Sequence, residues 1–283
     1  MQSAWRLNYI GLSFKALLIR RLGYLASGFL HILKSLPHRR RRLKPLRRLQ
    51  GTGTGRSALI IATGPSCNLL DPVTIREFQK SGNYLLVVNE FHRLKLADWI
   101  VPDMYVVADR GYEISTQPAN TFASGLSEYL RLHPTVSVAC PLDFVSLLGS
   151  TGIAMHEREI RFDFAGLDSW SKNTNPTRPR GYIGLTAFAA MAIAQYMDFD
   201  TIYLAGVDNS KFKMISRGEG KPLTLSDSHG YVGSEPLPHQ SLQAALEDYA
   251  RYFADLQMFD LSRFRTIDPA SLITDIQYAA LGD

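Results

Sequence analysis

Polar side chains follow several apolar runs of the sequence, each at the point where a run ends. They are Thr63 and Ser66, in one turn with Gly64, then Asn89, Asp109 and Asp208. If the runs are parallel strands, their carboxyl ends meet at one edge of a sheet, where open α/β folds bind ligands. Hydroxyl, amide and carboxylate groups that converge there could hold the ribose and phosphate of a nucleotide. Asp109 by itself is also compatible with a helix cap.

The turn at 63–66 lies between an apolar run and a helix start near Asp71-Pro72. Backbone N–H groups at such a turn can meet a phosphate or a ribose. The turn lacks the Gly-Lys-Ser/Thr ending of a phosphate-binding loop, and it is not a GxGxxG motif. An ordinary strand-to-helix turn is the simpler interpretation of these four residues alone.

Two histidines, His229 and His239, could act as a general base, because imidazole titrates near the working pH of most enzymes. They lie in residues 209–239, a long aperiodic segment of the kind that usually forms a functional lid or is disordered. Side chains that could contact an anionic donor are Arg180, Lys211, Lys213 and Tyr231. A solvated loop and ordinary surface histidines explain these residues equally well. No His, Cys, Asp or Glu set has metal-ligand spacing, so no metal site is expected.

The sequence indicates the elements that would position these residues most clearly in the segment 184–208. Small apolar residues recur at helical spacing between Ala187 and Ala194, which predicts a helix. Thr201 to Ala205 is a β-branched and aromatic run, typical of a strand covered on both faces. With similar runs at 58–62, 84–88, 105–108 and 135–139, the pattern predicts an α/β fold. We expect a single Rossmann-like nucleotide-binding domain with a mostly parallel sheet.

The charge distribution divides the chain at a Gly/Thr-rich stretch, 50–57. Residues 1–50 contain 12 Lys and Arg and no Asp or Glu, whereas the whole chain has 31 basic and 26 acidic residues. Residues 51–283 therefore carry 19 basic and 26 acidic groups, so the basic balance belongs to the head alone. A uniformly basic nucleic-acid-binding domain would not have this distribution. We expect a basic amphipathic segment at 1–50 and a catalytic domain at 51–283.

The head combines apolar and aromatic clusters with single cations and ends in a polybasic block at 38–48. Its longest uncharged run is about a dozen residues, short of the roughly 20 that a spanning helix needs. The pattern favours a helical segment in the interface of an anionic membrane. A solvated tail, an RNA-binding arm and a helical pair packed on the body are the alternatives. Two cysteines, Cys67 and Cys140, do not suggest a disulfide framework, and a reducing cytosol is the simpler context.

Several segments together resemble the bacterial sialyltransferases that carry an asparagine-led GPS motif. In order they are Thr63-Gly64-Pro65-Ser66, Asn89-Glu90-Phe91, residues 184–208, Ser228-His229-Gly230-Tyr231-Val232-Gly233 and Pro269-Ala270-Ser271-Leu272. The resemblance spans residues 58–275, and the central AxAIA followed by IYLxGxD is its nearest part. The same outline also resembles the motility-accessory-factor and MptE-like diphosphokinase group, which shares the GPS turn and the aspartate-ended strands.

The sialyltransferase resemblance implies a CMP-sugar-dependent transferase with a modified GT-A-like fold and no required metal or cofactor. A histidine base would deprotonate the acceptor hydroxyl, which then displaces CMP with inversion at the anomeric carbon. The resemblance places Gly64, Ser66, Asn89 and Asp208 in the donor site, with Thr186 at the head of the central helix. Asp109 stands where that family usually has an asparagine, and matches the diphosphokinase-like group instead.

The sequence also departs from the sialyltransferase pattern. Thr63 replaces the leading asparagine, and the two phosphate-binding tyrosines fall on Ser210 and Ser216. Lys211, Lys213 or Tyr231 could replace these phosphate donors. The base position is Ser234, so either His239 or His229 serves or the chemistry differs. The donor sugar is accordingly expected to be sialic-acid-like, nonulosonic or of the Kdo type.

These observations predict a glycosyltransferase on the cytoplasmic side, held peripherally at the inner face of the cell membrane. Its partners would be a nucleotide-sugar donor, a cell-surface glycan or lipid-linked acceptor and an anionic membrane. No nucleic acid partner is expected, and a homo-oligomer is compatible with the chain. One alternative is a pterin-type diphosphokinase that uses ATP and Mg²⁺. Another is a non-catalytic membrane-associated assembly factor.

Overall fold

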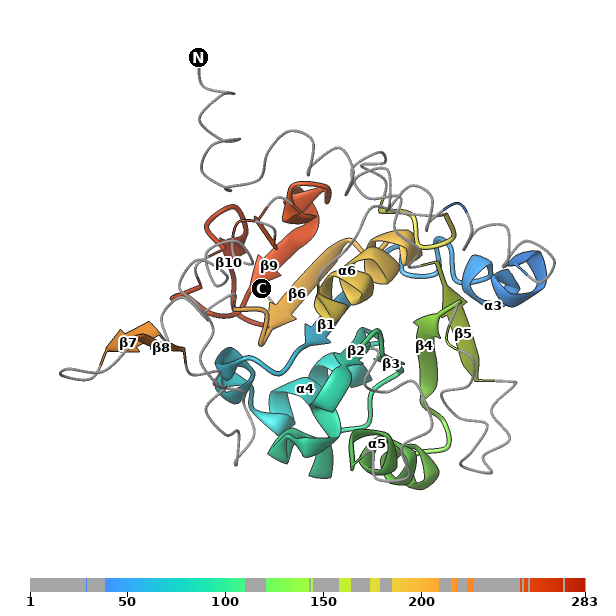
Figure 1. The fold of residues 1–283 in the computed structure, drawn as a ribbon. Coiled ribbons are helices and arrows are strands. Elements are labelled where there is room, and N and C mark those ends of the chain that lie inside the picture. The colour runs from blue at the N-terminus through green and yellow to red at the C-terminus, as the bar shows by residue number, and fades with distance from the viewer. Residues whose placement is uncertain are drawn as a thin grey trace, which may run out of the picture.

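The fold was examined in a computed structural model. It describes residues 29, 39–109, 121–142, 144, 158–163, 174–178, 185–208, 215–217, 223–225, 250, 252–253, 255–271 and 273–282. An eight-stranded sheet in the order β10-β9-β6-β1-β2-β3-β4-β5 forms the centre, and all its strand pairs are parallel (Figure 1). This is the single α/β domain with a parallel sheet that the sequence predicts. A short antiparallel pair, β7 with β8, lies apart from the sheet.

The strands are short, as is usual for a sheet buried on both faces. They are β1 (Ser57–Ile61), β2 (Tyr84–Val88), β3 (Met104–Val106), β4 (Ser137–Pro141), β5 (Glu159–Phe162), β6 (Thr201–Ala205), β7 (Ile215–Arg217), β8 (Leu223–Leu225), β9 (Phe264–Thr266) and β10 (Gln277–Tyr278). The helices are α3 (Lys44–Arg47), α4 (Pro72–Lys80), α5 (Thr121–Leu132) and α6 (Thr186–Met197). Short 3-10 turns are η1 (Pro65–Leu69), η2 (Asn89–Arg93), η3 (Lys95–Asp98) and η6 (Leu261–Arg263).

The strands predicted at 84–88 and 201–205 are confirmed residue for residue, and the others shift by one or two positions. The strand expected at 135–139 begins later, at Ser137. Pro134 and Thr135 form a turn instead, closed by a hydrogen bond from the Val136 N–H to the His133 carbonyl. Because of this turn, the first N–H to pair with a neighbouring segment is that of Ser137, which donates to the Asp103 carbonyl.

Alternate residues of each strand enter two separate cores, one on each face of the sheet. Ala58 and Ile60 face α6, whereas Leu59 and Ile61 face α4 and α5. The two faces of one strand are therefore both apolar, which explains the continuous hydrophobic runs in the sequence. Figure 1 shows α6 on one side of the sheet and α4 with α5 on the other.

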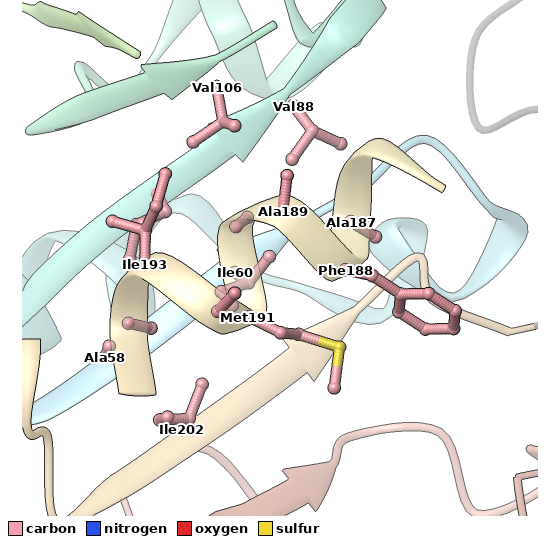
Figure 2. Packing of buried hydrophobic residues seen from close by; sticks show 14 of the residues in the cluster. Ala58, Ile60, Val88, Val106, Ala187, Phe188, Ala189, Met191, Ile193 and Ile202 are labelled. Atoms are coloured by element: carbon pink, nitrogen blue, oxygen red, sulfur yellow. The ribbon is translucent and has the colours of Figure 1, made fainter. Parts of the chain in front are cut away.

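Helix α6 is buried over nearly all of its surface. Its residues from Thr186 to Ala194 are all buried, and Ala58, Ile60, Val88 and Ile202 pack against it (Figure 2). Four alanines at 187, 189, 190 and 192 let the helix backbone lie close to the strands. The helix ends at Asp198, which adopts the left-handed conformation with φ 67°.

The end of the head, residues 39–49, packs on the body, where Leu43 and Leu46 are fully buried in the core of α6. The Gly/Thr stretch that follows also has fixed partners. The N–H groups of Gly51 and Gly53 donate to carbonyls at the carboxyl end of α6. The division of the chain at residue 50 stays a prediction. Among the described residues, no helix is both long and apolar enough to cross a membrane.

Candidate functional site

The strand order reverses its direction of growth at β1. From β1 the chain adds β2, β3, β4 and β5 on one side, then returns through α6 and places β6 on the other side of β1. In open parallel sheets, such a reversal leaves a crevice outside the carboxyl ends of the two central strands. The turns after β1 and β6 line this position, and they contain four of the predicted site residues: Thr63, Gly64, Ser66 and Asp208.

Ser66 and Asp208 join these two turns through a buried hydrogen-bond cluster. The Asp208 carboxylate accepts from the Ser66 hydroxyl and from the Ser66 N–H, the latter at 2.9 Å. The Ser66 oxygen in turn accepts from the Gly206 N–H at 2.7 Å. Both side chains are almost fully buried, at 6% exposure each. The cluster holds the carboxyl ends of β1 and β6 together.

The two turns approach so closely that only glycine fits at their contact points. Gly206 has φ 69°, and a Cβ there would collide with the Ala62 carbonyl. A Cβ on Gly64 would collide with the Gly206 carbonyl and lie 2.6 Å from the Asp208 carboxylate. The Gly64 N–H donates to the Gly206 carbonyl at 2.9 Å. The two glycines therefore allow the backbone of the turn after β1 to contact the backbone of the turn after β6 directly.

This contact bears on the two interpretations of the turn that the sequence left open, a contact with a phosphate or ribose and an ordinary strand-to-helix turn. Three N–H groups of the turn are used within the chain, as in an ordinary turn. Gly64 donates to Gly206, Ser66 to Asp208, and Cys67 to Gly64. The sequence could not show this, because the acceptors on Gly206 and Asp208 lie on a strand about 140 residues away. A nucleotide at this edge would need donors other than these three N–H groups.

Asn89 stands next along the same edge, directly after β2. Its φ of 47° lies in the left-handed region, which asparagine tolerates better than most residues. Its side-chain Oδ1 is buried and has no hydrogen-bond partner within the described part of the chain. A buried acceptor without a partner is costly, and the cost is removed when a ligand supplies the donor. Asn89 is thus the predicted residue with the clearest free binding capacity.

Tyr105 links Asn89 to His92 through hydrogen bonds. The Tyr105 hydroxyl donates to the Asn89 carbonyl, so its oxygen can only accept from His92. It receives the His92 backbone N–H at 3.2 Å and lies 3.1 Å from His92 Nδ1. Nδ1 must therefore carry the proton, which leaves Nε2 of the neutral ring as a bare acceptor. Burial, more than any nearby charge, lowers the pKa of His92 below its usual value.

The sequence analysis did not single out His92 as a functional candidate. Its Nε2 faces α5, where Gly125 leaves room for the ring because a Cβ there would lie 2.7 Å from Nε2. The only sequence signal was its position three residues after Asn89, at the end of a predicted strand. Tyr105, which orients the ring, was read simply as a strand residue. The pairing became visible only once β2 and β3 were placed side by side.

The remaining predicted residues differ in how they are placed. Asp109 is exposed just beyond β3, and Thr186 is buried at the first position of α6. That end of α6 lies by the tip of β6, where Figure 2 places Ala187 and Phe188. Six predicted residues lie outside the described parts of the chain, and their roles stay predictions: Arg180, Lys211, Lys213, His229, Tyr231 and His239.

Cys67, beside the Ser66 cluster, is a poor nucleophile. Burial in the first place, and the negative charge of Asp208 in the second, raise the pKa of its thiol to about 12. The thiol therefore stays protonated at physiological pH. Cys67 and Cys140 are both buried and free. Among the described residues, no group of three or more His, Cys, Asp or Glu side chains could hold a metal ion.

Comparisons with known proteins leave the chain without a family. No protein-family model matches the sequence, and a search of curated proteins finds no match. Among solved structures, the chain is similar to a MAf glycosyltransferase from Magnetospirillum magneticum AMB-1, with a TM-score of 0.48 and 11% identity. The match covers 84% of this chain and 37% of that chain, so this chain spans little more than a third of its length. A likeness at this level supports no conclusion about function.

Proposed function

We propose that the protein is a glycosyltransferase that binds a nucleotide-activated sugar at the carboxyl ends of β1, β6 and β2. One observation carries the proposal. One strand away from the reversal of strand order, the same edge carries a buried acceptor after β2, Asn89 Oδ1, that has no partner within the described chain. Parallel sheets bind nucleotides at this position, and a ribose hydroxyl or a base amino group would supply the missing donor.

The neighbouring groups fit such a ligand in different ways. In this proposal the Ser66–Asp208 cluster holds the carboxyl ends of β1 and β6 together: the Asp208 carboxylate accepts from Ser66, and the Ser66 oxygen accepts from the Gly206 N–H. The amino end of α6 faces the same edge; its first turn has no acidic residue, and its N-cap residue, Leu185, gives no side-chain cap among the described residues. A helix amino end attracts negative charge, so it is a suitable place for the donor phosphate.

The finer assignment rests on the sequence resemblance. We propose a CMP-activated donor carrying a sialic-acid-like, nonulosonic or Kdo-type sugar, and an acceptor on a cell-surface glycan or lipid-linked chain. His239 or His229 would remove the proton from the acceptor hydroxyl, and the alkoxide would displace CMP with inversion. Lys211, Lys213, Arg180 and Tyr231 are the proposed donors to the departing phosphate. No metal or other cofactor takes part in this scheme.

One observation favours a second candidate. Asp109 is an exposed carboxylate at the carboxyl end of β3, on the same edge as Asn89. A carboxylate there suits a Mg²⁺ that carries substrate phosphates, as a diphosphokinase using ATP would need. This candidate gives no role to the basic head.

A thermal-shift screen of the full chain distinguishes these candidates. The ligands are CMP, CDP, UDP, GDP and ATP, each with and without Mg²⁺. A ligand at 100 times its dissociation constant stabilises the folded state by about 2.7 kcal/mol, which raises the melting temperature of a chain of this size by roughly 5 °C. CMP acting without Mg²⁺ is the expected result. ATP acting only with Mg²⁺ would replace the proposal with the diphosphokinase, and no response to any nucleotide would favour a non-catalytic assembly factor.

Two variants assign the response to the proposed edge. Asn89→Gly removes the amide but keeps the left-handed backbone, because glycine adopts positive φ without strain. We expect it to abolish most of the CMP-induced shift. Asn83→Ala is the matched control: Asn83 precedes the same strand at the opposite edge, where its side chain accepts from the Ser57 N–H at 2.9 Å. Equal CMP shifts in the two variants would contradict the assignment.

A further inference from the structure

The polybasic block of the head is a fixed part of the body. Residues 39–47 form two short helical turns that meet at Leu43, and Leu43 and Leu46 are both completely buried. They belong to the same core as α6, and α3 packs beside β5 (Figure 1). The segment therefore covers the β5 end of the sheet much as α6 covers its centre.

Two arginines of the block are used to attach it. Arg39 forms an ion pair with Asp163, whose side chain is fully buried just after β5. Arg39 also donates to the Thr177 carbonyl at 3.2 Å, and Arg42 donates to the Leu142 carbonyl at 3.2 Å. Leu142 and Asp163 directly follow β4 and β5, so the block is anchored at the carboxyl edge of the sheet. This is also the edge of the candidate site.

The other cations of the block point away from the body. They are Arg40, Arg41, Lys44, Arg47 and Arg48, and all five are exposed. Within the described part of the chain, the five side chains form no hydrogen bond and no ion pair; the hydrogen bonds of Lys44, Arg47 and Arg48 are made by their backbone groups. Residues 1–50 contain no Asp or Glu that could neutralise them. These five exposed cations, on a segment whose Leu43 and Leu46 are buried, form what is here called the outer cationic face.

We propose that the outer cationic face is a docking surface for a membrane that contains anionic phospholipid. Cations beside an anionic membrane are each attracted by its surface potential, and a rigid face presents several of them together. The chain that leads into the block is rich in aromatic and aliphatic residues, among them Trp5, Tyr9 and Phe14. Phe29, the residue of that stretch described by the structure, has 60% of its surface exposed. Such residues enter the interfacial region of a bilayer.

Charge also argues against a nucleic acid as the partner. The body after residue 50 carries 19 basic and 26 acidic groups, so a long polyanion lying across it would be repelled. A flat membrane needs to meet only the outer face. The proposal is independent of the reaction that the protein catalyses, because none of the five cations is placed in the candidate site.

The test compares two triple variants of the full chain. Arg40→Gln, Arg41→Gln and Lys44→Gln together remove three charges from the outer cationic face. The control, Arg76→Gln, Lys80→Gln and Lys95→Gln, removes three exposed charges from α4 and η3 on the opposite face of the sheet. Binding is measured by sedimentation with vesicles of phosphatidylcholine containing 30 mol% phosphatidylglycerol, at about 0.1 M salt, and with pure phosphatidylcholine vesicles. The melting temperature of each variant is recorded in parallel.

Each cation near an anionic surface strengthens binding by about fivefold, so we expect the outer variant to bind on the order of 100-fold more weakly. The control should bind like the unaltered chain, and neither variant should change its melting temperature by more than a degree or two. Unaltered binding of the outer variant, or an equal loss in the control, would overturn the proposal. Tighter binding to a single-stranded RNA than to the anionic vesicles at the same salt would also overturn it, in favour of a nucleic acid partner.

Discussion

Ser66 links two turns that lie 142 positions apart in the chain. Its N–H and its hydroxyl both donate to Asp208, and its oxygen accepts from Gly206. A serine and an aspartate that the resemblance places in a donor site thus join the carboxyl ends of β1 and β6. This is compatible with the proposed function, in which a fixed edge would position a ligand against Asn89. It does mean that their replacement would act first on the shape of the edge.

His92 gives a testable prediction about pH. Burial lowers its pKa in the folded state below its value in the unfolded chain, while Glu90 opposes and Arg93 reinforces this shift. Below the unfolded pKa of about 6.5, the unfolded chain therefore binds more protons than the folded one, and stability falls as pH decreases. We expect the His92→Gln variant to lose less melting temperature than the unaltered chain between pH 7.5 and pH 5. Parallel melting curves of the two proteins over this range would contradict a buried neutral imidazole.

At the scale of elements, α6 shows why a helix can lack amphipathic character. Every residue from Thr186 to Ala194 is buried, because the helix lies between the sheet and further packed segments. Its alanines allow close approach to β1 and β2, and Gly206 ends the strand that follows. The helix, the strand and the turn could therefore be predicted together from the sequence, because the residues that favour each element locally are also the ones that its packing requires.

The sequence left the packing of segment 39–49 open, because its charge favours a membrane interface while a helical pair packed on the body was an alternative. In the structure Leu43 and Leu46 belong to the core. We expect Leu46→Ala to lower the free energy of unfolding by about 2–5 kcal/mol, because it opens a cavity in a packed interior. Leu132→Ala, at a position in α5 that is 58% exposed, is the control and should cost less than about 0.5 kcal/mol. Urea denaturation of both variants measures the difference. A loss at Leu46 no larger than that at Leu132 would show that the segment does not contribute to the core in solution.

At the scale of the whole molecule, the polybasic block has two roles, one in the core and one at the surface. Its inner side completes the core and its outer side carries unopposed charge, so a deletion that removes the head also removes core residues. We expect the chain lacking residues 1–50 to melt at a clearly lower temperature than the chain lacking residues 1–38. The longer deletion removes Arg39, Leu43 and Leu46, together with the ion pair to Asp163. Calorimetry of the two truncated chains makes the comparison.

Equal melting temperatures of the two truncated chains would show that the block is dispensable for the fold. The vesicle experiment must accordingly use point variants of the full chain. A deletion would confuse the loss of binding charge with the loss of packing.

The sequence by itself determined the elements and the edge on which the polar residues gather. Apolar runs, their lengths and the residues that end them are local properties, so β2 and β6 could be placed residue for residue. The convergence of Ser66, Asn89 and Asp208 followed from the rule that parallel strands share one carboxyl edge. Of the candidate site, the identities of these residues were predicted, and their division into structural and binding roles was not.

Only the tertiary structure decided which groups remain available at that edge. Hydrogen bonds between turns far apart in sequence use the donors of Gly64 and Ser66, whereas Asn89 Oδ1 has no partner among the described residues. The same is true of the head, where packing separates the arginines that hold the fold from those that face outward. The physical reason is that an N–H group already bonded within the protein is not available to a ligand, and the partner of each group depends on which distant segment lies beside it.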